Sequence, residues 1–452
     1  MAALHRRLNL LQASALNMAN MVGSGPFITI PLILGAMGGP QAMVGWIAGL
    51  VLAVCDGMVW AELATALPYS GGSYVYLREA FGRLPIRGLG QIVAFLFIWQ
   101  FLVSGTAEIA SGAIGFRQYY GYLDPQFHGN TTMLAHLMPP FVCLVCLVLL
   151  YRRIESVGKL AVILWVGMMA TMGVIIFLGL RHFEVSNLTP PPGAFTLNRA
   201  FYRGLGAAML VAMYDYLGYY DVCLVAEEVA EPRRTIPRSI LFSVCVIAAL
   251  YMLMNISMIA VVPWRDAMKS EYLASDFMEK VAGRGAAVVV TYMILWTSLA
   301  STFALLLGGS RVLMAAARDG CFFRIFARLH PTGDFPHFAL IVLAVLSAAA
   351  SLFALEDVID ILMVVRVLVQ FAGQIVALMI LRRTGARMQY RMWLYPVPAV
   401  IALGGWCYIF FTAKVAFIKI AVEVLAAGLI AGTLWYFAAK PPAPPALLDE
   451  SN

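Results

Sequence analysis

The chain has 452 residues, of which 62% are apolar and 12% are charged. Soluble domains are about 45–50% apolar and about 25% charged, so this composition excludes an ordinary soluble protein and predicts a protein embedded in lipid. The formal net charge of +7 does not indicate nucleic-acid binding, because the basic residues are dispersed at the edges of predicted loops, where topology and anionic lipid explain them.

Long apolar runs follow one another along the whole sequence, separated by short polar connections. A hydrocarbon core about 30 Å thick needs about 20 apolar residues per helix, whereas the strands of a membrane barrel would alternate apolar and polar residues. We therefore predict an all-α integral membrane protein with twelve transmembrane helices, near residues 10–35, 41–66, 88–119, 133–151, 158–181, 204–229, 239–263, 285–316, 337–354, 358–381, 393–412 and 416–438.

The positions of the basic residues predict which side of the membrane each end faces. With a cytoplasmic N-terminus, most of the 31 Lys and Arg fall in segments on the cytoplasmic side, as the positive-inside rule requires. We expect both termini in the cytoplasm and the protein in the inner or plasma membrane of the cell. Residues 1–9 form the predicted N-terminal segment, and residues 439–452 form a disordered, proline-rich tail.

The first predicted span contains Gly23-Ser24-Gly25-Pro26 at its centre. Pro26 has no backbone donor and the glycines permit non-helical angles, so the helix should open here. Inside a bilayer, such an opening is tolerated only where protein or a water-filled cavity covers the free backbone groups. The break is therefore a candidate binding site, although glycine and proline also serve simple packing in membrane helices.

The sixth span carries a polar and aromatic octet, Tyr214 to Asp221, with Gly218 inside it. This octet is the second predicted break. Spans 1 and 6 begin two blocks of five spans, which is the arrangement expected of inverted repeats with a substrate site between them. The predicted domains are the repeats over 10–181 and 204–381, an extracellular loop over 182–203, and accessory helices 11 and 12 over 382–438.

Four motifs occur in order along the chain. They are G-S-G-P-F at 23–27, A-E-L with P-Y-S-G-G-S-Y-V-Y-L-R-E-A-F-G within 61–82, E-E-V-A-E-P-R-R-T-I-P at 227–237, and R-D-G with F-A-R-L-H-P within 318–331. Over nearly the whole chain these motifs resemble the amino acid, polyamine and organocation transporter superfamily, whose members share the LeuT-type fold. The resemblance implies secondary transport by proton symport or solute exchange through alternating access, with no cofactor.

Under this resemblance, a substrate amino acid would be bound between the two breaks. The half-helix after the first break would direct free N–H groups and its positive dipole end at a carboxylate, near Ser24, Gly25 and Phe27. Carbonyl groups freed around Val22 and over 214–217 would accept from the amino group. The predicted substrate-binding residues are Val22, Gly23, Ser24, Gly25, Phe27, Tyr214, Asp215, Tyr216, Leu217, Gly218 and Tyr219.

Two of the residues at the breaks bear on the choice of substrate. Tyr219 falls where the family often has a large aromatic residue, so it could close over the substrate and contact a cation, although a tyrosine beside a break can also simply pack. Pro26 offers no N–H group, so the predicted carboxylate pocket is poorer in donors than one with another residue there. A polyamine therefore stays open as the alternative to an amino acid.

Several carboxylates fall within predicted spans. An isolated carboxylate in the membrane interior is costly and usually functional, so Asp215 and Asp221 either bind a cationic group or carry the coupled proton. Glu108 in span 3 is a third proton-coupling candidate. Asp56 and Arg366 are further buried charges, and one or more of these groups should pair. For Arg366, both a structural ion pair and a contact with an anionic substrate group stay open.

The residues favour protons over sodium as the coupling ion. Some family members carry a lysine in span 5 in place of a sodium ion, but Gly167 lies at that depth here. Hydroxyl groups that could bind sodium occur in span 8, at Thr297, Ser298, Ser301 and Thr302, although such groups also bond to the neighbouring backbone.

A channel and a membrane-embedded enzyme are the rival classes. The same broken helices could line a pore with flux that does not saturate, but the predicted repeats argue against one. An enzyme requires a nucleophile with a base, or a metal cluster, and neither is visible among the His, Cys and Asp positions. We expect no enzymatic activity and no metal, and we expect an amino acid or polyamine, protons and membrane lipids as the partners.

Overall fold

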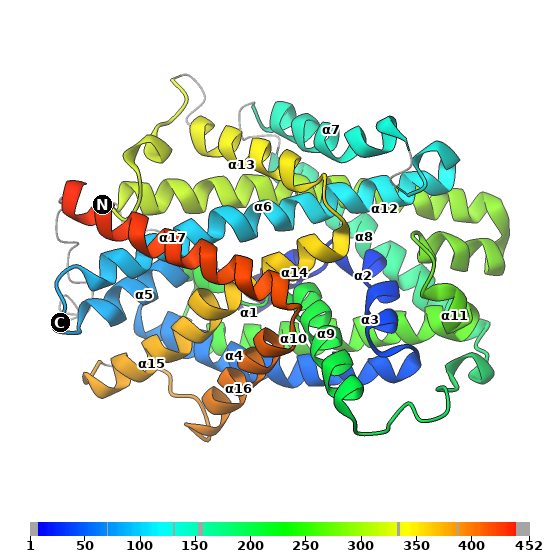
Figure 1. Ribbon diagram of the computed structural model, residues 1–452, viewed down its shortest axis with the longest axis horizontal. Coiled ribbons are helices and arrows are strands. Elements are labelled where there is room, and N and C mark those ends of the chain that lie inside the picture. The colour runs from blue at the N-terminus through cyan, green and yellow to red at the C-terminus, as the bar shows by residue number, and fades with distance from the viewer. Residues whose placement is uncertain are drawn as a thin grey trace.

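The computed structural model describes residues 8–69, 71–129, 132–151, 157–331, 335–386 and 388–439. In this part of the chain the apolar runs form long helices that lie side by side, and no strand is present (Figure 1). The helices are α1 (Leu10–Met21), α2 (Gly25–Ile28), α3 (Ile30–Met37), α4 (Met43–Ala66), α5 (Ser73–Gly82), α6 (Leu89–Leu123), α7 (Met133–Leu150), α8 (Val157–Arg181), α9 (Arg199–Tyr216), α10 (Pro232–Val261), α11 (Trp264–Ala267), α12 (Leu273–Arg318), α13 (His337–Ala350), α14 (Leu355–Arg366), α15 (Gly373–Arg383), α16 (Val397–Thr412) and α17 (Val415–Ala439).

Shorter helical segments join these helices. The 3₁₀ segments are η1 (Pro40–Ala42), η2 (Pro125–Phe127), η4 (Val185–Leu188), η5 (Asp221–Glu228) and η6 (Arg324–Ala327), and a π-helical segment, η7 (Val367–Ala372), continues α14 into α15. Leu8 pairs with Val229 in an isolated parallel bridge, which places it beside the end of η5.

Seven helical runs in the described residues are long and apolar enough to cross a membrane. An eighth is added if Leu10–Ile28 and Ile30–Met37, which bend by 62° relative to each other, form one span. The all-helical class of the prediction is confirmed. The count of twelve spans and the inverted repeat stay predictions. The seven runs are Pro40–Ala66, Leu89–Leu123, Met133–Leu150, Pro232–Val261, Leu273–Arg318, Leu355–Arg383 and Val415–Ala439.

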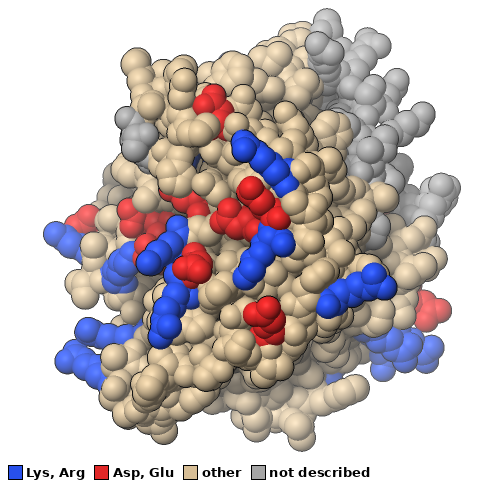
Figure 2. Space-filling view, turned by 90° about the vertical axis from the view of Figure 1, so that its right-hand side faces the viewer, with Lys and Arg blue, Asp and Glu red and all other residues tan. Residues whose placement is uncertain are grey.

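The outside of the bundle is suited to lipid along its length and to water at the end that faces the viewer in Figure 2. Large apolar side chains such as Phe141, Val148 and Phe177 are exposed on the outer helices, as lipid-facing residues should be. Figure 2 looks onto the end of the bundle that holds α3 and α11, where Lys, Arg, Asp and Glu side chains gather. We call this the α11 end and the opposite one, which holds α5 and α15 in Figure 1, the α5 end.

Helix α6 lies at the centre of the packing. It runs along α12 and also packs against α5, α14 and α17, and its residues Phe95 and Tyr119 are fully buried. The α5 end contains the start of α6 and the end of α12, because Arg78 of α5 forms an ion pair with Asp319 directly after α12. Two long helices of opposite direction thus form one continuous wall beside the helix breaks.

Helical structure is interrupted at both places where the sequence predicts a break. Helix α1 ends at Met21, and Val22 is extended, with ψ 90°. Helix α9 ends at Tyr216, after which Leu217 is non-helical and Gly218 has φ +103°. A Cβ on Gly218 would lie 2.9 Å from backbone atoms of Asn20 and Met21, so the two breaks pack directly on each other and only glycine fits at this contact.

Candidate functional site

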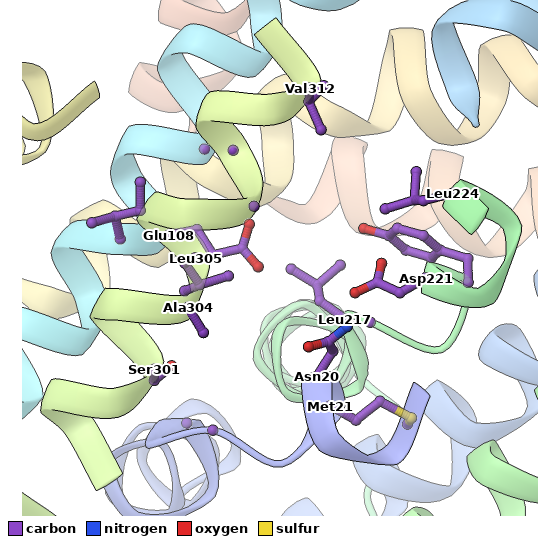
Figure 3. A pocket seen from close by; sticks show the side chains of 18 of the residues that line it. Asn20, Met21, Glu108, Leu217, Asp221, Leu224, Ser301, Ala304, Leu305 and Val312 are labelled. Atoms are coloured by element: carbon purple, nitrogen blue, oxygen red, sulfur yellow. The ribbon is translucent and has the colours of Figure 1, made fainter. Parts of the chain in front are cut away.

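A cavity of about 370 Å³ lies where the two breaks meet α6, α12 and α14. Figure 3 shows Asn20 and Met21 of α1 and Leu217 of the second break between two walls, one carrying Glu108 and Ser301 and the other carrying Asp221 and Leu224. The predicted site residues that line the cavity are Val22, Gly23, Gly25, Glu108, Tyr214, Asp215, Leu217, Gly218 and Asp221.

The first break contributes backbone rather than side chains to the cavity. A Cβ on Gly23 would lie 3.0 Å from Oγ of Ser301, and a Cβ on Gly25 would collide with Oδ1 of Asp215. The hydroxyl of Tyr251 donates to the carbonyl of Met21 over 2.7 Å, which pairs one of the carbonyls left free at the end of α1. Buried backbone groups must be paired in lipid, and here α10 supplies a partner.

Asp215 lies at the contact between the breaks. Its side chain is 3% exposed, and the hydroxyl of Thr29 donates to Oδ2 over 2.6 Å. Oδ1 has no hydrogen-bond partner among the described residues and faces the position that a side chain on Gly25 would occupy. A buried carboxylate oxygen without a donor is costly, and an ammonium group in the cavity would supply that donor.

Glu108 and Arg366 form an ion pair inside the cavity. The expectation that at least one of the buried charges would pair is therefore confirmed. Arg366 is 2% exposed, and its Nε atom has no hydrogen-bond partner among the described residues. Arg366 ends α14, and the π-helical segment η7 starts at the next residue, so the guanidinium is held at a point where the helix geometry changes.

Asp221 begins η5 and faces Glu108 across the cavity in Figure 3. The amide side chain of Asn20 also lines the cavity. The described lining thus holds the carboxylates of Glu108, Asp215 and Asp221 and the guanidinium of Arg366. Glu108 and Arg366 neutralise each other, whereas Asp215 and Asp221 form no ion pair among the described residues.

Ser24, Phe27, Tyr216 and Tyr219 do not line this cavity. The carbonyl of Phe27 accepts a hydrogen bond from Tyr119 over 2.7 Å, and the hydroxyl of Tyr216 points to the carbonyl of Trp46. The hydroxyl of Tyr219 donates to Oδ2 of Asp56 over 2.5 Å, on the side of the second break away from the cavity. The neighbouring Tyr220 faces the cavity instead.

Other lining residues were not singled out from the sequence. Tyr220 stacks on Trp60 with ring centroids 4.1 Å apart, and Asn20 and Gln370 add polar groups. Asn20 precedes the Gly-Ser-Gly-Pro break by three residues, and a polar residue beside a predicted break was the signal that could have identified it. Tyr220 lies within the predicted break at 214–221, but helical periodicity is lost once a helix ends, so the sequence did not show which tyrosine of this octet faces the cavity.

The cavity extends toward the α5 end, and side-chain contacts join α6 to the neighbouring segments at the α11 end. Its lining on α6 runs from Phe97 to Ile109, in the half that starts at the α5 end, and Gly71 and Ser73 at the start of α5 also line it. At the α11 end, Arg117 donates to the carbonyl of Gly129 over 2.7 Å and lies 3.6 Å from Glu271. The hydroxyl of Tyr122 donates to Glu279 over 2.7 Å.

Membrane-length helices around a mostly apolar cavity of this size with a few charged groups define an integral membrane protein with a site for a small solute. The family model described as amino acid permease matches residues 8–439, and the chain belongs to this family. The resemblance to the amino acid, polyamine and organocation superfamily is thereby confirmed.

Curated relatives of the chain are transporters. It is 25% identical over 380 residues to human cationic amino acid transporter 4, a match that covers 80% of this chain and 57% of the relative. It is 29% identical over 354 residues to an uncharacterized transporter of Mycobacterium tuberculosis, covering 77% and 74%. It is 27% identical over 350 residues to the cystine/glutamate transporter of Pongo abelii, covering 75% and 66%. The chain thus spans little more than half the length of the human relative.

Proposed function

We propose that the protein is a secondary active transporter of amino acids that works by alternating access and is coupled to protons. The observation that carries this proposal is the pair of acidic groups, Asp215 and Asp221, in the cavity between two helix breaks. An α-amino group is the cation that every amino acid presents, and Oδ1 of Asp215 lacks a donor. A volume of about 370 Å³ suits a single small molecule.

Amino acids with cationic side chains are the favoured substrates. Glu108 already has Arg366 as its partner, so a substrate with two ammonium-type charges would neutralise Asp215 and Asp221 together. Desolvated charges need such partners. Two of the relatives described above are named for amino acid substrates, one for cationic amino acids. A polyamine is the alternative substrate, because a carboxylate next to Gly25 would have to lie close to the carboxylate of Asp215.

The breaks also support the proposed LeuT-type repeat. We infer that α1 to α3 and α9 with η5 are the broken first helices of inverted repeats over 10–181 and 204–381, within twelve spans. In such transporters the solute binds at the broken helices, and one repeat rocks against the other. With cytoplasmic termini in the cell membrane, the α5 end is the inner end. The cavity then represents an inward-facing state, closed to the outside at Arg117 and Tyr122.

The first experiment measures the thermal stabilisation of the purified protein by matched pairs of solutes, since a ligand that binds only the folded state raises the apparent stability. L-arginine and L-lysine are compared with agmatine and cadaverine, which lack the carboxylate, and with L-alanine, L-glutamate and spermidine. Stabilisation by L-arginine and L-lysine beyond their amines supports the proposal. Stabilisation by the amines and spermidine alone supports the polyamine alternative, and no stabilisation by any of these solutes contradicts both.

A flux assay separates transport from conduction. In proteoliposomes, a carrier shows saturable uptake and counterflow of radiolabelled L-arginine, whereas a channel shows neither. An inward proton gradient that drives accumulation indicates symport. Uptake that requires an internal amino acid, whatever the pH gradient, indicates the exchanger alternative.

A further inference from the structure

Asp56 is a membrane-buried carboxylate that lies outside the cavity. It is in the middle of α4, is 1% exposed, and is absent from the cavity lining. Tyr219 donates to Oδ2 over 2.5 Å and Nε1 of Trp406 donates to Oδ1 over 3.0 Å. Both oxygens therefore have a neutral donor, and each donor comes from a different element.

No cation balances Asp56 among the described residues. The titratable groups next to it are Cys55 on its own helix and Tyr219 from the second break, and behind Tyr219 lie Tyr220 and Cys223. Gly57 of the same helix packs on the uncharged side chain of Ile240 in α10. A carboxylate in lipid without a counter-ion is costly and usually functional, and taking up a proton removes that cost.

The two donors connect Asp56 to elements that shape the cavity. Tyr219 belongs to the turn after α9, and the next two residues, Tyr220 and Asp221, line the cavity. Trp406 of α16 stacks on Phe371 of η7 with ring centroids 3.8 Å apart. The segment η7 directly follows Arg366 and also holds the cavity residue Gln370. A change in the protonation of Asp56 can therefore affect both the turn that carries Asp221 and the segment that follows Arg366.

We propose that Asp56 binds the coupling proton. A proton from water adds to the Oδ2 carboxylate oxygen and gives a neutral carboxylic acid, with no other bond formed or broken except hydrogen bonds. The new O–H group occupies the place of the Tyr219 donor, so the Tyr219 hydroxyl must reverse its role or leave. The hydrogen bond that ties the turn carrying Tyr220 and Asp221 to Asp56 of α4 is thereby reversed or lost, so the position of this turn in the transport cycle depends on the proton.

This inference rests on the proposed proton-coupled transport and locates the proton site. Symport requires that the proton and the solute be bound at the same time. Glu108 is already paired with Arg366, and Asp215 and Asp221 face the solute in the cavity. Asp56 lies outside the cavity, so it can bind a proton while the solute is bound. The proton site and the solute site are separate but share one movable turn. Binding of either ligand can therefore shift the equilibrium between two positions of that turn.

Transport by Asp56→Asn in proteoliposomes tests the assignment. We expect this variant to retain counterflow of radiolabelled L-arginine and to lose accumulation driven by an inward proton gradient. Tyr76→Phe is the matched control, because the Tyr76 hydroxyl also reaches η5, at the carbonyl of Cys223, but contacts no carboxylate. Gradient-driven accumulation by Asp56→Asn at the wild-type level overturns the proposal, as does an equal loss in Tyr76→Phe.

Two further measurements keep the assignment testable if Asp56→Asn does not fold or L-arginine is not a substrate. Tyr219→Phe removes a donor from the ionised carboxylate, so the proton should stay bound to a higher pH and the pH profile of transport should move upward. An unmoved profile overturns the assignment. Infrared difference spectra of the wild-type protein should show a carboxylic acid C=O band that titrates. This band should be altered in Tyr219→Phe and absent from Asp56→Asn. A band identical to that of the wild-type protein in either variant overturns the assignment. A wild-type protein without L-arginine binding contradicts the proposed substrate alone.

Discussion

Gly25 and Asp215 are in direct contact across the two helix breaks, so that a Cβ on Gly25 would overlap with Oδ1 of Asp215 and lie 3.3 Å from the ring of Tyr214. The contact joins residues that are far apart in the sequence and makes the shape of one break depend on the other. Gly25 does not have a positive φ. Glycine is therefore required here by the lack of space for a side chain and not by the backbone conformation.

Gly25→Ala should weaken binding of L-arginine, because the added methyl group displaces Asp215 or Tyr214 from the cavity wall. We expect a loss of at least about tenfold in affinity, which corresponds to about 1.4 kcal/mol, measured by thermal stabilisation or radioligand binding. Gly35→Ala on α3 is the control, since a Cβ there meets nothing within 4 Å. Equal affinity in the two variants would remove Gly25 from the site.

Asp215→Asn should abolish L-arginine uptake while the protein stays folded. The amide oxygen can still accept the hydrogen bond from Thr29, but the negative charge that meets the ammonium group is lost. Uptake is measured in proteoliposomes and thermal unfolding in detergent, which separates a loss of transport from a loss of folding. Unchanged uptake with unchanged pH dependence would show that Asp215 takes no part in transport.

Glu108 and Arg366 should behave as one unit in a double-mutant cycle. Arg366→Gln leaves a buried carboxylate without its partner, and breaking such a pair costs about 3–5 kcal/mol. Glu108→Gln in the same chain should recover part of that loss, measured as free energy of unfolding in mixed micelles. Additive effects of the two substitutions would contradict a direct interaction.

Two ion pairs at the α5 end should differ strongly in their contribution to stability. Glu62 is fully buried and accepts from Nε and Nη2 of Arg382 at 2.7 Å, so Arg382→Ala should destabilise the protein by about 3–5 kcal/mol. Asp319, paired with Arg78, has a side chain that is 43% exposed, and the buried Arg78 keeps Glu79 as a second partner at 3.0 Å, so Asp319→Asn should cost only about 0–1 kcal/mol. Thermal unfolding of the two variants side by side checks the order, and a larger loss for Asp319→Asn would reverse it.

The sequence alone was sufficient for the class of protein and for the two breaks. Lipid demands long apolar helices with paired backbones, so composition and run length predict membrane helices without knowledge of packing. Gly23 and Gly218 lie at the two interruptions, and Pro26 is tolerated only in the first turn of a helix, here α2, so the interruptions also follow from local chemistry. The family followed from motifs that keep their order along the chain.

The tertiary structure alone decided which polar groups meet. Glu108 and Arg366 are 258 positions apart, and nothing in the local pattern of either residue favours that partner over Asp56 or Asp221. Tyr219 and Tyr220 are chemically identical neighbours, yet one binds Asp56 and the other faces the cavity. The physical reason is the same in both cases. A helix interior has a fixed periodicity that the sequence reveals, whereas a broken segment takes its direction from the helices packed against it.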